Sequence, residues 1–341
     1  MKNKWILWPL ALVLAGSLLV GCSSTNTNGT NDADSKDVKT VEKRTIRFGS
    51  HLAENHSLVI AAKKFAEIVG ENTNGNIDVQ IFPNGTIGQQ RDLIEGMQLG
   101  TIDMSINDPG LMSNFAPRVG ILDLPYMFND YDHVRKTLDG EVGKALADDL
   151  LKQGIRSLAW TGTAFRDVLT NEKVKSFDDM KGLKLRSPEA PIYFNTMKAF
   201  GANPTPIPWG DTYTALQTGV VDGMEGSAES VFTAKMNEVT KYLIRTQHIF
   251  TAISINISEK TWQKLSADDQ KIMLAAAKEA ADYAWDLNIK GDKEFVNKLL
   301  SEGKMTEIKV DLAPFKESVK SVNSDYAKKV DAQDLVDKIQ K

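Results

Sequence analysis

The chain has 341 residues, of which 42% are hydrophobic and 25% are charged, and its formal net charge is −4 at pH 7. This composition is typical of a globular protein long enough for two domains. The mildly acidic balance gives no support for nucleic-acid binding. Cys22 is the single cysteine, which excludes internal disulfides, thiolate metal sites and a cysteine nucleophile in the folded part.

The first 42 residues differ in composition from the rest of the chain. Two lysines precede an apolar run over residues 5–19, and the run ends in the lipobox-like sequence LVGC at residues 19–22. About fifteen apolar residues interrupted by Pro9 are short for a membrane span. We therefore predict a lipoprotein signal peptide over residues 1–21, with Cys22 carrying the lipid after cleavage. Loss of Lys2 and Lys4 takes the formal charge from −4 to −6. Residues 22–42, rich in Ser, Thr, Asn, Asp and Lys, predict a disordered tether to the membrane.

Strands and helices alternate in the first half of the mature chain. We expect strands at 45–48, 77–82, 102–106 and 155–160, and helices at 58–69, 89–99 and, for the most part, 132–151. Polar side chains gather where two of these strands end. The loop over 49–57 holds His51 and Glu54, and Asn107 and Asp108 follow the strand at 102–106. Asp108 is therefore expected on the same side of the sheet as the His51 loop, although a solvated turn is the default for any one of these residues.

The stretch from Lys181 to Ser227 concentrates the polar chemistry of the chain. Its pattern predicts a strand at 183–185, a helix from Pro191 to Gly201, an edge strand or link at 203–208, a helix at 212–218 capped by Asp211, and a strand beginning at 220–221. This order of elements implies a mostly parallel sheet with ligand-facing residues beyond the carboxyl ends of its strands. Arg186, Trp209 and Glu225 fall at such ends or links.

Arg166 repeats the placement of Arg186, because it follows the strand at 155–160 and a glycine-containing turn over 161–166. Either arginine alone is more often part of a surface ion pair. Two at analogous positions, each beside an aromatic residue or a proline, suit a carboxylate, because each guanidinium presents a planar set of donors. Trp209 lies on a link between prolines and Gly210, so we expect it to face the ligand. Phe165 and Tyr213 are further candidates, although a core position is the default for both.

The last third of the chain has a simpler pattern. Residues 241–250 and 251–257 read as strand material, and Ser266 is expected to cap a helix that runs from about Ala267 to about Leu300. At about 1.5 Å per residue, such a helix is long enough to span two lobes. The residues after Val310 are expected to be helical and peripheral.

No motif for a cofactor or a metal is present. The four histidines, at 51, 56, 133 and 248, do not show metal-ligand spacing, and GxSxG, GxGxxG after a strand and phosphate-loop patterns are missing. We therefore expect neither a metal nor a cofactor. A pair of carboxylates for glycoside hydrolysis stays open, since acidic residues are plentiful.

Together these stretches resemble the substrate-binding subunits of TRAP transporters, the tripartite ATP-independent periplasmic family, whose DctP-like members bind dicarboxylates or sugar acids. The resemblance extends from about Thr45 to Lys341 and is most specific at residues 82–104, 182–223 and 238–242. It implies an α/β, two-lobed fold like that of periplasmic binding proteins, with crossing segments and a long helix spanning both lobes. Residues 43–163 with 252–290 would form lobe I, residues 164–251 with 291–341 would form lobe II, and the ligand would lie in the cleft between them.

The resemblance also assigns roles to single residues. Arg186 occupies the position of the arginine that makes a paired contact with the ligand carboxylate, Arg166 matches the second arginine, and Trp209 matches an aromatic residue that packs on the ligand. Where many members read DGQENP, this chain reads DGMEGS at residues 222–227, so Gly226 replaces a ligand-binding asparagine. This departure leaves the identity of the ligand open, though not its carboxylate.

The residue types around the two arginines narrow the ligand. The other candidate groups are Asp108, Glu225, Glu54, Asn107 and His51, and acidic side chains accept hydrogen bonds from hydroxyls but repel a second carboxylate. We expect a monocarboxylate sugar acid, such as a hexuronate or aldonate, ahead of a C4-dicarboxylate.

The function that follows is that of a lipid-anchored, extracytoplasmic, monomeric receptor that hands an organic acid to TRAP membrane permease subunits. Two alternatives stay open. One is an enzyme on a two-lobed scaffold, such as a lyase or glycosidase. The other is a receptor for an ATP-driven transporter or a signalling kinase.

Overall fold

Two long antiparallel strands, β4 (Ile155–Thr170) and β8 (Tyr242–Ser258), form the centre of the sheet in this computed structural model, which describes residues 43–341. The nine-stranded sheet has the order β2-β1-β3-β8-β4-β7-β5-β6, and β9 (Thr306–Ile308) also pairs with β8. The flanking strands are β1 (Arg44–Gly49), β2 (Ile77–Phe82), β3 (Met104–Asn107), β5 (Lys184–Ser187), β6 (Asn203–Pro206) and β7 (Gly223–Ser227). The expected signal peptide, Cys22 and the tether lie outside the described residues.

The sheet is mixed, which corrects the expectation of a mostly parallel one. Within each outer trio, β2-β1-β3 and β7-β5-β6, the strands are parallel, as the alternation of strands and helices predicts. The central contacts β3–β8, β8–β4 and β4–β7 are antiparallel. The proline-rich β6 lies at the edge of the sheet, as expected, where a missing backbone N–H does not break a ladder.

The turn expected at residues 161–166 is wrong, because β4 continues through it to Thr170. The regular pairing of β4 with β8 is interrupted by shifts of register, and one of these shifts lies between Gly162 and Phe165. Such a bulge lets a strand bend without leaving the sheet. The two separate strands expected at 241–257 are one continuous strand, β8, which pairs with β4 on both sides of the register shift.

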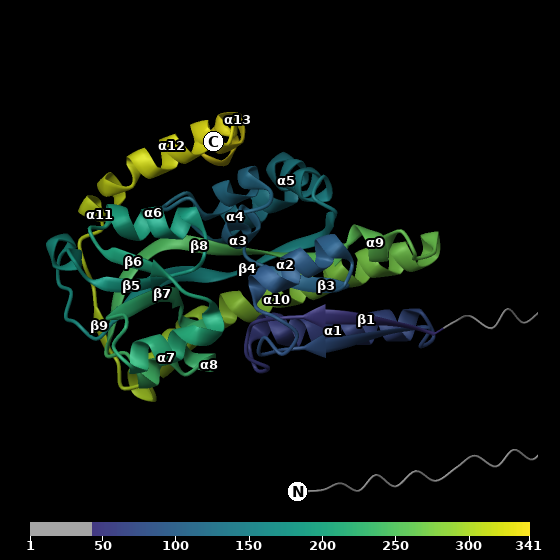
Figure 1. Ribbon diagram of the computed structural model, residues 1–341, viewed down its shortest axis with the longest axis horizontal. Coiled ribbons are helices and arrows are strands. Elements are labelled where there is room, and N and C mark those ends of the chain that lie inside the picture. Colours follow the sequence, from purple (N-terminus) through teal and green to yellow (C-terminus); the bar gives the residue numbers. More distant parts are fainter. Residues whose placement is uncertain (1–42) are drawn as a thin grey trace, which may run out of the picture. The chain divides into compact units, whose positions relative to one another are not determined.

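The helices that bear on the site are α1 (Ser57–Asn72), α2 (Gln90–Leu99), α3 (Pro109–Met112), α6 (Pro191–Ala199), α7 (Thr212–Gln217), α8 (Ala228–Thr233) and α10 (Ala267–Ser301). The others are α4 (Tyr131–Asp139), α5 (Glu141–Leu151), α9 (Glu259–Trp262), α11 (Ala313–Ser318), α12 (Lys320–Lys329) and α13 (Gln333–Ile339). In the view of Figure 1, helices α4, α5, α6 and α12 lie above the central strands, and helices α1, α7 and α8 lie below them. None of the helices in residues 43–341 combines the length and the apolar character that crossing a bilayer requires.

The long helix α10 confirms the expectation drawn from residues 266–300. The Ser266 side chain accepts a hydrogen bond from the backbone N–H of Asp269, which caps the helix. Along its 35 residues, α10 packs against β4, against α1 near one trio of strands and against α8 near the other (Figure 1). The helix therefore links both halves of the fold.

Separate apolar cores underlie the two outer trios. Ile46, Phe48 and Phe65 belong to a core built from β1–β3, α1 and α10, whereas Leu169 and Met224 belong to a core near β7 and α8. A third buried cluster includes Leu185 of β5, and a fourth and larger one includes residues of α2, α3, α4, α5 and α6. The mixed sheet with helices packed against it and the long α10 confirm the expected α/β fold class.

Two local expectations are wrong. Asp211 makes no side-chain cap at α7, because its backbone is already helical (φ −94°, ψ −8°) at the end of a short turn from Trp209. The strand expected from Val220 begins only at Gly223, because Gly219 (φ +72°) ends the preceding turn and leaves Val220 exposed.

Candidate ligand-binding site

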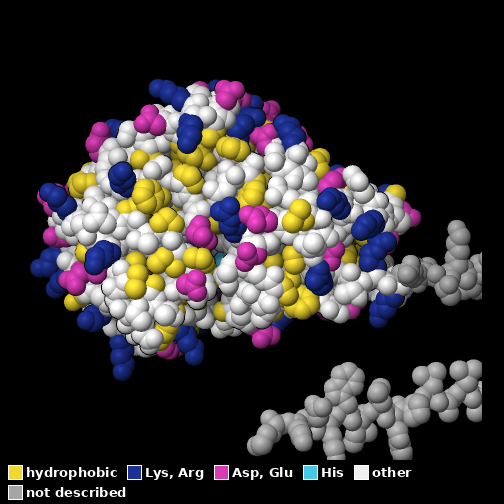
Figure 2. Space-filling model, in the orientation of Figure 1, with side chains coloured by type: hydrophobic (Ala, Val, Ile, Leu, Met, Phe, Trp, Pro, Cys, Tyr) yellow, Lys and Arg dark blue, Asp and Glu magenta, His cyan; other side chains and the backbone are white. Residues whose placement is uncertain are grey.

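A cavity lies where the two outer trios of strands face each other across β4 and β8. Its wall includes His51, Gln90 and Asp108 from the first trio and its helices, Arg186 and Trp209 from the second, and Arg166 and Thr251 from the central strands. On the face drawn in Figure 2, a histidine side chain is visible in a hollow near the middle, with basic and acidic side chains around it. The cavity is thus lined by residues far apart in the sequence.

Arg186 is a buried cation in the wall of this cavity. It is the third residue of β5, and only 3% of it is exposed. Its Nε donates to the carbonyl oxygen of Ile207 at 2.8 Å, and its guanidinium carbon lies 5.5 Å from the centre of the Trp209 ring. Within residues 43–341 it forms no ion pair with a carboxylate. Burial lowers the pKa of Arg186 to about 10, against the opposing effect of Glu225.

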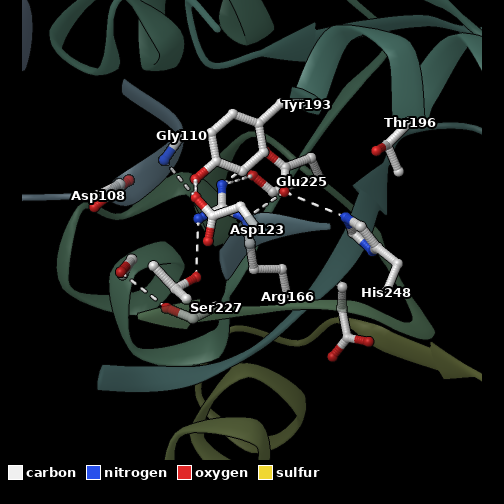
Figure 3. Close-up of polar contacts among 12 residues, drawn as sticks. Asp108, Gly110, Asp123, Arg166, Tyr193, Thr196, Glu225, Ser227 and His248 are labelled. Carbon is white, nitrogen blue, oxygen red and sulfur yellow. Dashed lines mark hydrogen bonds and ion pairs between the residues drawn. The ribbon is translucent and has the colours of Figure 1, made fainter. Parts of the chain in front are cut away.

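Arg166 has a carboxylate partner of its own (Figure 3). Its Nε and Nη2 donate to the two carboxylate oxygens of Glu225, the latter at 2.6 Å, and Nη1 donates to Thr251 at 3.2 Å. The Tyr193 ring centre lies 5.0 Å from the guanidinium carbon. Burial opposes the charge on Arg166, but Glu225 outweighs it, so the pKa of Arg166 is raised. The two arginines therefore have different environments.

Glu225, in the middle of β7, is fully buried and does not line the cavity. Burial by itself would raise the pKa of Glu225, but the charge of Arg166 and hydrogen bonding hold that pKa well below its ordinary value. His248 Nε2 lies 3.3 Å from Glu225 Oε2, and burial lowers the pKa of this histidine. Glu225 thus serves Arg166 rather than the cavity.

On the opposite wall, Gln90 joins His51 and Asp108. The backbone N–H of Asp108 donates to Gln90 Oε1 at 3.0 Å, and Gln90 Nε2 lies 3.2 Å from both Asp108 Oδ2 and His51 Nε2. Burial raises the pKa of Asp108. The pKa of His51 is lowered to about 3 by burial, then by His56, Arg186 and Arg166. Asp108 reaches this position because it follows β3 directly and Pro109 starts α3 after it.

Gln90 was not among the residues expected at the site, although its position in the sequence is unusual. Gln90 shares one face of α2 with Leu93, Ile94 and Met97, all of which are buried. A polar residue on the apolar face of a helix needs a buried partner. Glu189, which follows β5, is a further lining residue that was not expected.

Besides Glu225, four more of the expected site residues lie outside the cavity wall. Glu54 is exposed and pairs with Lys63 at 2.8 Å, and the Tyr213 hydroxyl donates to Glu238 at 3.1 Å. Asn107 accepts hydrogen bonds from Ser105 and Asn256, and Phe165 packs edge-on against Phe250 with 5.2 Å between ring centres. No group of three or more His, Cys, Asp or Glu side chains in residues 43–341 is arranged to hold a metal ion.

The chain is similar in sequence to bacterial solute-binding proteins. The family described as bacterial extracellular solute-binding protein, family 7, matches residues 48–329. The 2,3-diketo-L-gulonate-binding periplasmic protein YiaO of Escherichia coli K12 is 34% identical over 262 residues, which cover 76% of this chain and 80% of that protein.

Solved structures of similar proteins cover nearly the whole of the described chain. A TRAP periplasmic solute-binding protein from Polaromonas sp. JS666, bound to D-erythronate, superposes with a TM-score of 0.84 at 31% identity, over 87% of this chain and 98% of that one. One from Roseobacter denitrificans OCh 114, with bound L-galactonate, has a TM-score of 0.83 at 32% identity, over 88% and 99%.

Proposed function

Because this chain belongs to the family 7 bacterial extracellular solute-binding proteins, the solute receptors of TRAP transporters, we propose that it captures a sugar acid with one carboxylate. An aldonate or a hexuronate fits this description. The ligand occupies the cavity between Arg186 and Asp108 and is delivered from there to the membrane permease subunits. The observation that carries the proposal is Arg186, a buried cation in the cavity wall without a carboxylate partner among residues 43–341.

Arg186 is the proposed anchor of the ligand carboxylate. Its Nε is already bonded to Ile207, which fixes the guanidinium plane and leaves the two terminal nitrogens for the ligand. Trp209 covers the guanidinium on one side and would exclude water from the contact. Arg166 adds positive potential to the same cavity, but Glu225 occupies two of its donors, so we assign Arg166 the secondary role.

The remaining polar side chains of the cavity favour hydroxyl groups over a second carboxylate. Asp108 accepts hydrogen bonds, and a second carboxylate beside it would meet a like charge as the cavity excludes water. Glu189 in the same wall adds to this effect. A sugar acid is therefore preferred to a C4-dicarboxylate, which stays the alternative ligand.

We also propose the lobe boundaries expected from the sequence, with residues 43–163 and 252–290 in lobe I and residues 164–251 and 291–341 in lobe II. The register shift between Gly162 and Phe165, opposite Phe250 and Ala252, supports a hinge at these crossings. A Cβ at Gly162 would lie 2.5 Å from the Phe250 ring, so only glycine fits the crossing without a rearrangement.

A buried hydrogen-bond cluster would join the lobes away from the ligand. The Glu229 carboxylate of α8 accepts from both the backbone N–H and the hydroxyl of Ser57, each at 2.7 Å, at the first turn of α1. The Ser57 hydroxyl also lies 2.7 Å from Asn288 Oδ1 on α10, and Asn288 Nδ2 donates to the carbonyl oxygen of Gly162 at 2.8 Å. This cluster favours the closed arrangement of the lobes.

The N-terminal residues support a lipid anchor. We propose that Cys22 carries the lipid and that the protein works as a monomer on the outer side of the membrane, without catalysing a reaction on its ligand. Cys22→Ser should move the protein from the membrane fraction to the soluble fraction. Prolonged incubation with a bound sugar acid should return the acid unchanged.

A thermal-shift screen tests the proposed ligand class. The fragment from Val41, which forms one compact unit, is heated with aldonates, hexuronates, C4-dicarboxylates, 2-oxo acids and neutral sugars. A ligand present at 100 times its dissociation constant adds about 2.7 kcal/mol to stability, a shift of several degrees. Stabilisation by sugar acids alone supports the proposal. Stabilisation by dicarboxylates alone would select the alternative, and stabilisation by neutral sugars alone would contradict both.

A further inference from the structure

The orientation of the Gln90 side-chain amide is fixed by a group that can only donate. The backbone N–H of Asp108 points at one end of this amide at 3.0 Å, so that end is the oxygen. The other end is therefore the NH2 group, and it lies 3.2 Å from Asp108 Oδ2 and 3.2 Å from His51 Nε2. An amide nitrogen only donates, so both of these atoms must be acceptors.

This orientation determines the tautomer of His51. The ring is buried and its pKa is lowered to about 3, first by burial and then by His56, Arg186 and Arg166, so it is neutral near pH 7. A neutral imidazole has one donor and one acceptor nitrogen. Since Nε2 accepts from Gln90, the proton resides on Nδ1.

Three polar atoms in the cavity wall then lack partners among residues 43–341. His51 Nδ1 and Thr163 Oγ1 are buried without a hydrogen bond, and no hydrogen bond engages Asp108 Oδ1. Buried polar groups normally have hydrogen-bond partners, so we expect a bound ligand to supply the partners of these three atoms. His51 supplies a donor and Asp108 supplies an acceptor, which together match one hydroxyl group, because a hydroxyl both accepts and donates.

We propose that Gln90 is a specificity-determining positioning residue, which holds His51 as the Nδ1–H tautomer beside Asp108 and so makes this wall a subsite for a hydroxyl group. The inference rests on the proposed function, namely that the cavity holds a sugar acid. The opposite tautomer would present two acceptors and would suit an amino group instead. A methylene group in the subsite leaves both partners unpaired, and a second carboxylate faces Asp108.

The tautomer is tested first, in the ligand-free protein. Nitrogen-15 NMR of the histidine side chains distinguishes a protonated Nδ1 from a protonated Nε2, and His51→Asn identifies the His51 signals among those of the four histidines. We expect His51 to be neutral near pH 7, with its proton on Nδ1. In Gln90→Met, the Nε2–H form should become populated. A parent protein whose His51 carries the proton on Nε2 would overturn the inference, whichever ligand binds.

Binding is tested next with L-galactonate and hexanoate as probes, which share a carboxylate and a six-carbon chain but differ in hydroxyl groups. Gln90→Met should weaken L-galactonate binding about 10- to 100-fold and leave any hexanoate binding nearly unchanged, because only the hydroxyl subsite is lost. Gln98→Met, the same substitution on the same helix away from the cavity, should bind like the parent.

The two proposals fail in different ways. A parent protein that binds no aldonate or hexuronate contradicts the proposed function. A parent that binds L-galactonate, with a folded Gln90→Met variant that binds it equally well, contradicts the role of Gln90 alone.

Discussion

Glu225 binds Arg166 through both of its carboxylate oxygens, so one of the two cavity arginines is neutralised within the protein. Arg186, in the same wall, has no such partner among residues 43–341. The pKa values follow this difference, because that of Arg166 is raised and that of Arg186 is lowered to about 10. A ligand carboxylate would therefore gain most at Arg186, while the pair of Arg166 and Glu225 supports the cavity wall.

Glu225→Gln tests the structural role of this pair. The substitution leaves a buried guanidinium without its counter-charge, which typically costs about 3 to 5 kcal/mol of folding free energy. Denaturant unfolding with and without the substitution measures the cost. Glu67→Gln removes an exposed glutamate that pairs with Lys64 on α1, and it should change stability by less than about 1 kcal/mol. Equal stability of the parent and Glu225→Gln would contradict the role assigned to the pair.

The stability of the fold should fall as the pH rises through the region in which Asp123 ionises. Burial raises the pKa of Asp123 from 3.8 to about 7, although its Oδ2 accepts hydrogen bonds from the Gly110 N–H and the Tyr193 hydroxyl (Figure 3). The folded state thus favours the protonated acid, so its advantage is complete below pH 3.8 and is lost progressively up to about pH 7.

Asp123→Asn should flatten this part of the stability profile, because an amide does not ionise. Chemical unfolding at a series of pH values measures the slope. Asp167, whose pKa is also raised to about 7 by burial, should leave a residual slope of the same sign. A profile for Asp123→Asn that retains the full slope of the parent would show that Asp123 ionises normally.

Glu229→Ala should weaken ligand binding without touching the proposed carboxylate anchor. The Glu229 carboxylate accepts from the backbone N–H and the hydroxyl of Ser57, and alanine leaves the buried N–H without an acceptor. The closed arrangement loses stability relative to the open one, and affinity for L-galactonate should fall about 10-fold. Distances between spin labels on the two lobes report the shift towards the open form. Unchanged distances and affinity would show that the cluster does not control closure.

How much of this could be read from the sequence depends on the range of each signal. The long helix from Ala267 and its Ser266 cap were predicted because periodicity and capping are local. The merging of residues 155–170 into one strand was not, because the pairing of β4 with β8 depends on residues far away in the chain. Sheet pairing of this kind leaves only a weak local pattern.

The site shows the same division. Arg186, Trp209, His51 and Asp108 line the cavity from strand ends, links or nearby residues, whereas Arg166 lines it from within β4 and not from the strand end at which it was expected. The partnership of Arg166 with Glu225, 59 residues apart, could not be read from spacing, since both were equally plausible as ligand contacts. The importance of Gln90 could have been predicted, because it is a polar residue on the otherwise apolar face of α2.

The most direct test of the central claim is the affinity of Arg186→Ala for a sugar acid, measured by isothermal titration calorimetry with L-galactonate. Removing the guanidinium leaves the ligand carboxylate unpaired in a dry cavity, which costs on the order of 2 to 5 kcal/mol, or about 30-fold to several thousand-fold in affinity. Arg186→Lys should lie between this variant and the parent, because it keeps the charge and loses the planar pair of donors. A folded Arg186→Ala variant that binds L-galactonate as tightly as the parent would contradict the account.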